Sequence, residues 1–328
     1  MAGSGNAHLR PDSAAPVLRV ADLVVEFPVG RKQVVHAVSG VSIDVLDGET
    51  LGVVGESGCG KTTLGRAVMQ LEVAAAGQVR YRGTDLTELD GADLARARSR
   101  MQMIFQDPVS SLNPRRRVHD IVREGLEIWG DAEEPSSVAR VDAVMDAVGL
   151  TGPDVGERRP HEFSGGQCQR ICIARALVMD PDVLILDEPV SALDVSVQAQ
   201  ILNLLEDLKR DFQLSMVFVS HDLAVVRTIS DRVMVMYLGK VCEVAATGRV
   251  FEAPAHPYTR ALLASIPGQP LDLPPAAELI EGELPSPIDP PSGCRFRTRC
   301  PLADERCAAE EPVMREVAPD HFVACHHA

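Results

Sequence analysis

The chain has 328 residues, 45% hydrophobic and 24% charged, a composition that argues against wholesale disorder and allows one large domain with an appendage or two modest ones. Its 47 acidic against 32 basic residues leave a net charge of −15, which disfavours nucleic acid as the main partner. No apolar run approaches the roughly 18 residues of a membrane helix, and the first residues lack the apolar core of a signal peptide. A soluble, cytosolic protein is expected.

The first part of the chain predicts short strands around a glycine-rich turn. Residues 1–16 are expected to form a flexible tail, and β-type stretches predict strands at 17–27 and 77–83. A strand at 50–54 runs into the turn. A helix is predicted to follow, because apolar residues recur at i, i+3, i+4 and i+7 there: Leu64, Ala67, Val68 and Leu71.

The middle of the chain is polar and helical in pattern over 107–163, after which strands and helices alternate. Helices are predicted at about 165–178 and over the apolar stripe from Val197 to Leu208, with strands at 183–186 and 216–219. The continuous aliphatic runs are typical of strands covered on both faces, as in a largely parallel sheet. Seven prolines between 270 and 291 indicate a linker or surface wrap before a cysteine-rich end.

The glycine-rich turn matches the phosphate-binding pattern G-x-x-x-x-G-K-[ST] from Gly55 to Thr62, between a strand and a helix as that pattern requires. Small residues let backbone N–H groups approach phosphate oxygens at the start of a helix. Lys61 supplies a charge for the β- and γ-phosphates and Thr62 a hydroxyl for Mg²⁺. A chance glycine-rich turn is the alternative reading.

Two carboxylates, Asp187 and Glu188, end the aliphatic strand at 183–186. Open α/β sheets bind ligands at this end of their strands. Asp187 is expected to hold Mg²⁺ through water, and Glu188 to act as the general base on the attacking water. An acidic pair in this position is otherwise more often a surface or helix-capping feature.

The order of these motifs resembles the nucleotide-binding subunit of an ATP-binding-cassette transporter. The resemblance spans about 200 residues and is carried by the Gly55–Thr62 loop, Gln106, Phe163-Ser164-Gly165-Gly166-Gln167, Asp187-Glu188, Ser191-Ala192-Leu193-Asp194 and His221. It implies an α/β, RecA-like P-loop core with an antiparallel β subdomain and an inserted α-helical subdomain. We therefore expect a cassette domain at 17–250, with its helical subdomain at about 107–163, and a C-terminal cysteine-rich extension at 251–328.

The resemblance also implies a role for each motif residue. Gln106 would touch Mg²⁺ and the attacking water, His221 the γ-phosphate, and Asp194 the dimer interface. Phe27 would stack on adenine, although a plain core phenylalanine is the alternative. Contacts to ATP are expected from the loop (Gly55, Glu56, Ser57, Gly58, Cys59, Gly60, Lys61, Thr62 and Thr63) and from the signature sequence (Ser164, Gly165, Gly166 and Gln167).

Two residues depart from the family pattern. Phe163 replaces the commoner Leu, and Cys168 stands where the family usually has a charged residue, which puts one polar contact near the signature in doubt. Lys61 and Ser164 act on different ATP molecules in this family. The resemblance therefore implies a head-to-tail dimer with a second cassette, either a paralogue or a second copy, coupled to two membrane permease subunits and, through them, an extracytoplasmic peptide-binding protein.

The C-terminal extension points to one subfamily. His256-Pro257-Tyr258-Thr259 and the pattern C-x5-C-P-x-A-x4-C-x17-C resemble oligopeptide, dipeptide and nickel importers. The four cysteines of that pattern, Cys294, Cys300, Cys307 and Cys325, could hold a [4Fe–4S] cluster, one Zn²⁺, or remain free thiols. The intervals of five and six residues and the resemblance favour iron–sulfur. His321, His326 and His327 are expected to be exposed tail residues, His326 being the best alternative ligand.

The sequence thus predicts a peripheral ATPase on the cytoplasmic face of the cell membrane that powers import of di- or oligopeptides. The alternatives are nickel or another solute, an exporter cassette, and a nucleic-acid-acting cassette ATPase. The last is disfavoured by the charge, the single cassette and the absence of heptads.

Overall fold

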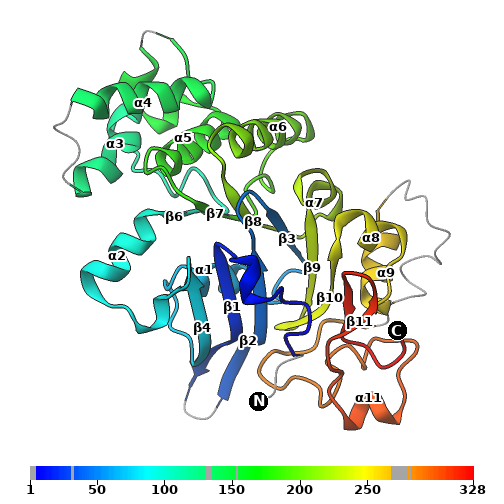
Figure 1. Cartoon of the computed structure of the whole chain (residues 1–328). Helices are drawn as coiled ribbons and strands as arrows, with labels where there is room; N and C mark the ends of the chain where they lie inside the picture. Colours follow the sequence, from blue (N-terminus) through cyan, green and yellow to red (C-terminus); the bar gives the residue numbers. More distant parts are fainter. Residues whose placement is uncertain (1–4, 31–32, 130–134, 153, 267–279, 281) are drawn as a thin grey trace. The chain divides into compact units, whose positions relative to one another are not determined.

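The computed structural model describes residues 5–30, 33–129, 135–152, 154–266, 280 and 282–328. The chain divides into two compact units, which we describe separately. Unit 1 comprises Met1–Leu89 and Val217–Ala328, and unit 2 comprises Asp90–Met216. Figure 1 labels most of the elements of both.

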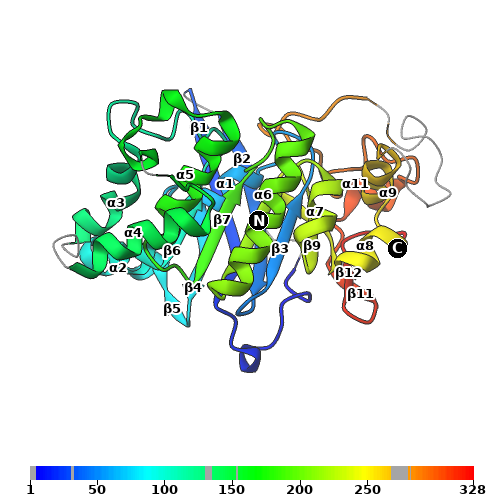
Figure 2. The same cartoon turned by 90° about the horizontal axis from the view of Figure 1, so that it is seen from above.

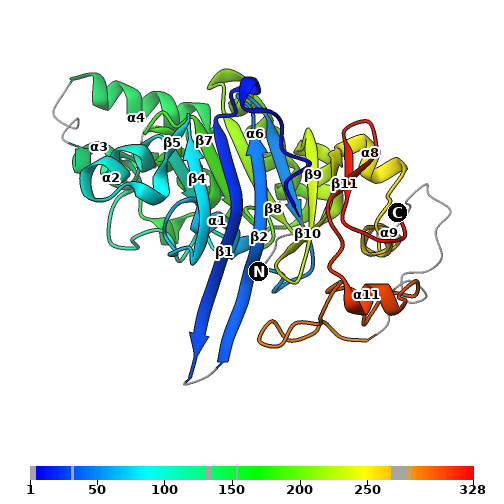
Figure 3. The ribbon, with the colours of Figure 1, turned by 60° about the horizontal axis from the view of Figure 1, so that its bottom comes forward.

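An antiparallel sheet in unit 1 has the strand order β2-β1-β4-β5. It comprises β1 (Leu18–Val29), β2 (Gln33–Val45), β4 (Ala76–Tyr81) and β5 (Thr84–Asp85). Figure 3 shows β1 and β2 lying side by side along their length. The strands predicted at 17–27 and 77–83 are confirmed, whereas β2 was not predicted.

The second sheet of unit 1 is only partly parallel. Its strands run in the order β11-β12-β10-β9-β3-β8. β3 (Thr50–Val54) pairs in parallel with β9 (Arg232–Tyr237), but β10 (Lys240–Ala246) and β12 (His321–Val323) continue it in antiparallel fashion. The prediction of a largely parallel sheet is wrong at this end, because the C-terminal strands add to an outer edge. The remaining strands are β11 (Arg315–Ala318) and β8 (Ser215–Ser220), which begins in unit 2.

The helices of unit 1 are short. They are η1 (Asp12–Ala14), α1 (Lys61–Val68), η2 (Leu86–Glu88), α7 (Leu223–Ile229), α8 (Thr247–Glu252), α9 (Pro257–Ala264) and α11 (Glu305–Ala309). Leu71, expected on the buried face of α1, is 48% exposed. The helix ends before it, because Gln70 adopts a positive φ of 54° and the Leu71 N–H turns back to the Arg66 carbonyl at 2.8 Å.

Unit 2 combines two parallel strands with a group of helices. β6 (Met101–Ile104) pairs with β7 (Val183–Asp187), and Figure 2 shows α3, α4 and α5 packed together. The helices are α2 (Gly91–Ser99), α3 (Val118–Trp129), α4 (Pro135–Ala147), η3 (Val155–Glu157), η4 (Pro160–Glu162), α5 (Gly165–Leu177) and α6 (Val195–Asp211). Val118, Ile121, Val122 and Leu126 form a buried stripe on α3.

The segment expected to be a flexible tail packs onto unit 1 in its described part. His8 is 3% exposed, and its Nε2 lies 2.8 Å from the Ser42 carbonyl oxygen. Arg10 donates two hydrogen bonds to the Glu49 carboxylate, at 2.7 and 2.8 Å. This bidentate pair and the buried histidine give residues 8–10 a fixed place that composition did not indicate.

Half of the predicted proline-rich linker, residues 270–279 and 281, lies outside the described residues. Among the helices that the structure describes, none combines the length and apolarity needed to cross a bilayer.

Candidate functional site

The phosphate loop of unit 1 connects β3 to α1, and its glycines are sterically required. A Cβ at Gly55 would lie 2.2 Å from the Met236 carbonyl oxygen. Gly60 has a φ of 102°, and a Cβ there would lie 2.1 Å from the Ala37 carbonyl oxygen. Any other residue would displace the backbone of a neighbouring strand, so the loop conformation depends on these glycines.

Lys61 is buried beneath this loop. Its Nζ donates to the carbonyl oxygens of Gly55 at 2.7 Å and Glu56 at 3.0 Å. Ser57 and Gly58 are exposed at the surface of the loop, and Thr62 and Thr63 lie in the first turn of α1. The loop therefore presents its backbone to solvent at a helix start, with the ammonium group already in place.

In unit 2 the structure brings Gln106 and Glu188 together. Gln106 Nε2 donates to Glu188 Oε2 at 3.0 Å, although the residues are 82 positions apart. Asp187 ends β7 and is only 3% exposed. Glu188 follows with a φ of 47°, in the left-handed region. A non-glycine residue in this conformation stores strain, a feature concentrated at functional sites.

The predicted signature sequence forms the N-terminus of α5. Ser164 caps the helix: its Oγ accepts from the Gln167 N–H at 3.3 Å, and the Gln167 side chain accepts from the Ser164 N–H at 3.0 Å. A Cβ at Gly166 would lie 2.5 Å from Val197 of α6, so close packing of the two helices requires glycine. Cys168, expected near a polar contact, is buried.

The other predicted site residues lie at the ends of elements or along a strand. His221 and Asp222 follow β8, and Asp194 precedes α6. Phe27 is half-buried in β1, opposite Val35. The phosphate loop, Phe27 and His221 thus belong to unit 1, whereas Gln106, the signature, Asp187, Glu188 and Asp194 belong to unit 2.

The four cysteines of the C-terminal pattern gather in unit 1. The Cys294 N–H donates to the Cys307 carbonyl at 2.8 Å. Burial, with a smaller contribution from the neighbouring thiols of Cys307, Cys325 and Cys300, raises the pKa of Cys294 to about 12. Burial likewise raises the pKa of the other three thiols, so all four are protonated at neutral pH unless a metal displaces the protons.

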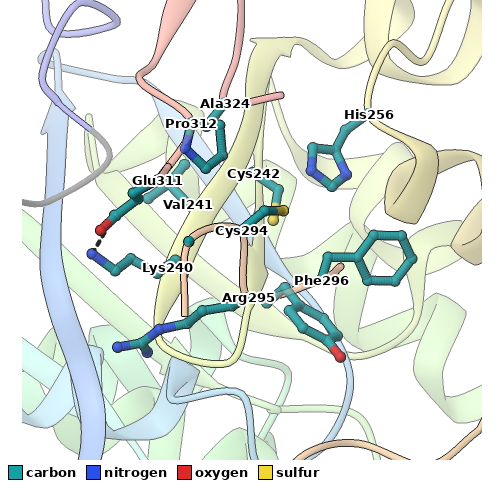
Figure 4. Close-up of a pocket in the computed structure, with 12 residues that line it drawn as sticks. Lys240, Val241, Cys242, His256, Cys294, Arg295, Phe296, Glu311, Pro312 and Ala324 are labelled. Carbon is teal, nitrogen blue, oxygen red and sulfur yellow. Dashed lines mark hydrogen bonds and ion pairs between the residues drawn. The ribbon is translucent and has the colours of Figure 1, made fainter. Parts of the chain in front are cut away.

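A fifth thiol, Cys242 on β10, belongs to the same neighbourhood. Figure 4 shows its sulfur beside that of Cys294 in a small cavity that Phe296 and His256 also line. Burial raises the pKa of Cys242 well above its usual value, and Cys294 contributes to the rise. The spacing of Cys242 from the other cysteines in the sequence contains no signal for this proximity.

The C-terminal histidines differ from expectation. His321 is buried, with Nε2 2.6 Å from Glu243 Oε1. His327, not His326, approaches a thiol: its Nε2 lies 3.6 Å from Cys307 Sγ and 3.4 Å from Asp304 Oδ2. Asp304, Cys307 and His327 form the one tight group of potential metal ligands among the described residues.

Comparison with known proteins identifies the class. Residues 38–191 match the family described as ABC transporter, and residues 242–307 match the oligopeptide/dipeptide transporter C-terminal region. The chain is also similar to two solved cassette structures. The dimeric cassette MJ0796 bound to ADP and Pi aligns with a TM-score of 0.62 and 25% identity over 70% of this chain and 98% of that one. CbiO1 of Clostridium perfringens aligns with a TM-score of 0.64 and 26% identity over 73% and 92%.

Closer relatives come from bacterial peptide transport. The chain is 50% identical over 314 residues to the putative oligopeptide transport ATP-binding protein YkfD of Bacillus subtilis, covering 95% of each chain. It is 50% identical over 320 residues to the oligopeptide transport ATP-binding protein OppF of Salmonella typhimurium, covering 94% and 95%. The chain therefore belongs to the ATP-binding proteins of ABC transporters, in the branch that carries the oligopeptide/dipeptide C-terminal region.

Proposed function

We propose that the chain is the ATP-hydrolysing subunit of a peptide importer, bound peripherally to the cytoplasmic face of the membrane. The observation that carries the proposal is the hydrogen bond between Gln106 and Glu188, in a chain that also carries a complete phosphate loop. The named functions of the relatives, which extend over nearly the whole chain, support peptide as the solute.

In this proposal the phosphate loop binds the triphosphate of ATP. Lys61 neutralises charge on the β- and γ-phosphates, and Thr62, Gln106 and Asp187 would hold Mg²⁺, which stabilises the developing negative charge. Glu188 takes a proton from the attacking water, and His221 contacts the γ-phosphate. Phe27 is the candidate adenine contact, supported by its half-buried position near the end of a strand.

A second cassette completes the arrangement. The exposed N-terminus of α5 presents Ser164 and the following backbone N–H groups, which suit an anion from another subunit. Asp194, also exposed, is the candidate dimer contact. Two cassettes arranged head to tail would bind two ATP molecules, and hydrolysis would let them separate.

A groove in unit 2 supports a permease contact. Its apolar lining comes from β6, α3 and the segments that follow β6 and α5 and includes Met103, Phe105, Ile128 and Met179, while Glu124 and Arg175 are among its polar lining residues. Ile128 is 76% exposed and Trp129 37%. A cytoplasmic segment of the permease is the occupant we propose, because the family of the chain acts in transport and a large exposed apolar side chain otherwise favours aggregation.

The four clustered thiols fit a metal centre by the chemistry of their donor set. We propose that Cys294, Cys300, Cys307 and Cys325 bind a [4Fe–4S] cluster, which would supply a structural or redox-sensing centre and no step of ATP hydrolysis. The alternative is Zn²⁺, for which Asp304, Cys307 and His327 offer closely spaced ligand atoms.

Metal analysis of anaerobically purified protein separates these two cases. The cluster predicts brown protein with about four iron and four sulfide per chain. His327→Ala should leave this cluster in place, as should the matched control His326→Ala, whose side chain bonds the Glu310 carbonyl instead. Colourless protein with stoichiometric zinc that is lost in His327→Ala would show that the cluster assignment is wrong.

The function is tested by co-purification from the membrane followed by reconstitution. The expected result is a complex with two permeases in which a peptide-loaded binding protein stimulates ATP hydrolysis. Stimulation by nickel but not by peptides would assign the other solute class. Absence of ATP binding to the purified chain would refute the proposal altogether.

A further inference from the structure

The second residue of the phosphate loop, Glu56, is bonded by side chains from the far end of the chain. Arg299 Nη1 donates to Glu56 Oε2 at 2.8 Å, 243 positions away. The Arg299 side chain is 9% exposed and lies over the ring of Tyr237. This ion pair is therefore shielded from solvent on the arginine side and is stronger than a surface pair.

The backbone of Glu56 has a partner of its own. Its N–H donates to the Tyr258 hydroxyl at 2.8 Å. Tyr258 lies in α9 and is fully buried. Both the main chain and the side chain of Glu56 are therefore bonded to the C-terminal region, and neither bond involves a nucleotide.

Residues 294–300, which we name the cysteine loop, connect these two contacts. Phe296 of this loop packs edge-on against Tyr237, with ring centroids 5.2 Å apart, and against Tyr258 at 5.4 Å. Figure 4 shows Phe296 beside His256. Phe296 is 2% exposed. The cysteine loop thus packs against the tyrosine that bonds Glu56, while its own Arg299 bonds the Glu56 carboxylate.

A second route joins the cysteine loop to the phosphate loop through the turn between β9 and β10. Arg295 donates to the Leu238 carbonyl and, at 2.9 Å, to Ser39 Oγ. The neighbouring Gly239 N–H donates to the Cys59 carbonyl of the phosphate loop at 2.8 Å. Contacts therefore reach the phosphate loop at Glu56 and at Cys59.

We propose that the cysteine loop positions the phosphate loop for nucleotide binding, with Arg299 and Tyr258 as the positioning residues. This inference rests on the proposed function in one respect, that residues 55–62 bind ATP. A glycine-rich loop must be ordered before its N–H groups can converge on a phosphate. If the free loop is already ordered, binding does not have to supply the free energy of ordering it, and the affinity is higher. The C-terminal region supplies this order without contacting the ligand.

The test is the affinity of the full-length protein for a fluorescent ATP analogue, MANT-ATP, with Mg²⁺. Arg299→Ala and Tyr258→Phe should each weaken binding, Arg299→Ala by roughly tenfold, as expected for loss of one charge-assisted hydrogen bond. The matched control is Arg297→Ala. Arg297 lies in the same loop and has the same charge, but its side chain donates to Ser292, at 2.9 Å from Nε to the carbonyl oxygen, and not to Glu56.

A double-mutant cycle distinguishes positioning from general destabilisation. Glu56→Gln should weaken binding in the wild-type background but change it little in the Arg299→Ala background, because the contact is already lost. Arg299→Lys should recover part of the affinity. If Arg299→Ala fails to fold, Tyr258→Phe remains informative, since it keeps the buried ring and removes only the hydroxyl.

The outcomes are distinct. Wild-type protein that does not bind MANT-ATP would refute the proposed function. Wild-type binding together with unchanged affinity in folded Arg299→Ala and Tyr258→Phe would overturn the positioning role. An equal loss in Arg297→Ala would also overturn it, because the effect would then belong to loop stability rather than to Glu56.

Discussion

Gln106 and Glu188 lie 3.0 Å apart, from Nε2 to Oε2, on segments that are 82 residues apart in sequence. The amide donates to the carboxylate, so it holds the Glu188 side chain in one orientation. The proposed function makes Glu188 the general base, a role in which the position of the carboxylate matters before its pKa.

Replacing Glu188 by Gln should therefore lower the ATPase rate by about 100-fold or more while ATP binding is retained. The amide keeps the size of the side chain but cannot take a proton from water. Steady-state phosphate release and MANT-ATP titration measure the two effects. Glu206→Gln, an exposed change on α6, is the control and should leave both unchanged. Undiminished turnover would remove Glu188 from this role.

The ion pair between Asp44 and Arg232 should contribute to the stability of unit 1. Asp44 is fully buried in β2, and its Oδ1 accepts from Arg232 Nη2 at 2.7 Å. Asp44→Ala should lower the free energy of unfolding by about 3 kcal/mol, because the largely buried Arg232 guanidinium loses the nearer of its two carboxylate partners, the other being Glu49 at 3.4 Å. Urea denaturation measures the change. The control Asp47→Ala breaks the exposed pair with Arg82 and should cost no more than about 0.5 kcal/mol. Equal losses in both variants would contradict the argument.

His256 should make stability depend on pH. Burial lowers its pKa to about 4, so the unfolded chain binds more protons than the native one between that value and about 6.5. The free energy of unfolding must then fall as the pH drops through this window, by about 2 kcal/mol between pH 7 and pH 5.

His256→Asn tests the assignment without removing the helix cap. His256 Nδ1 accepts from the Tyr258 N–H at 3.0 Å, and the asparagine side-chain oxygen is a suitable replacement. The variant should lose much less stability between pH 7 and pH 5 in urea titrations. An identical pH profile would show that another group is responsible. The buried Glu243 should affect the free energy of unfolding only at lower pH. Burial opposes its ionisation, but its hydrogen bonds, above all the one from His321, keep its pKa below the usual value.

Ile128→Asp should prevent co-purification with the permease while leaving ATP binding intact. A new charge among the apolar residues of the groove would have to be desolvated when the permease segment enters it. Pull-down from detergent-solubilised membranes measures the loss. Val138→Asp, at a 45% exposed position on α4 that does not line the groove, provides the control. Undisturbed association of Ile128→Asp would place the permease elsewhere.

The features that could be predicted from the sequence are those determined by residues close together in the chain. The phosphate loop needs particular residues at adjacent positions, and the structure places Gly55 and Gly60 where a Cβ would collide with backbone. The helix predicted at about 165–178 is likewise present, as α5. These features could be predicted because a few neighbouring residues determine them.

The features that could not be predicted depend on residues that are far apart in the sequence. β2 was missed because its regular alternation is interrupted by His36, Ser39 and Gly40, and its buried Asp44 is satisfied by Arg232, 188 residues away. His321 was placed in an exposed tail, yet it is buried beside Glu243. Arg299 carries no motif, so its bond to Glu56 could not be anticipated from spacing.

The hydroxyl of Tyr258 that accepts from the Glu56 N–H has a consequence for gene surveys. A reading frame interrupted by a stop codon shortly before position 258 would still encode every diagnostic nucleotide motif and would be counted as intact by any motif search. Its product would lack both groups that bond Glu56. Such a truncated allele should therefore encode a cassette with a lower affinity for ATP.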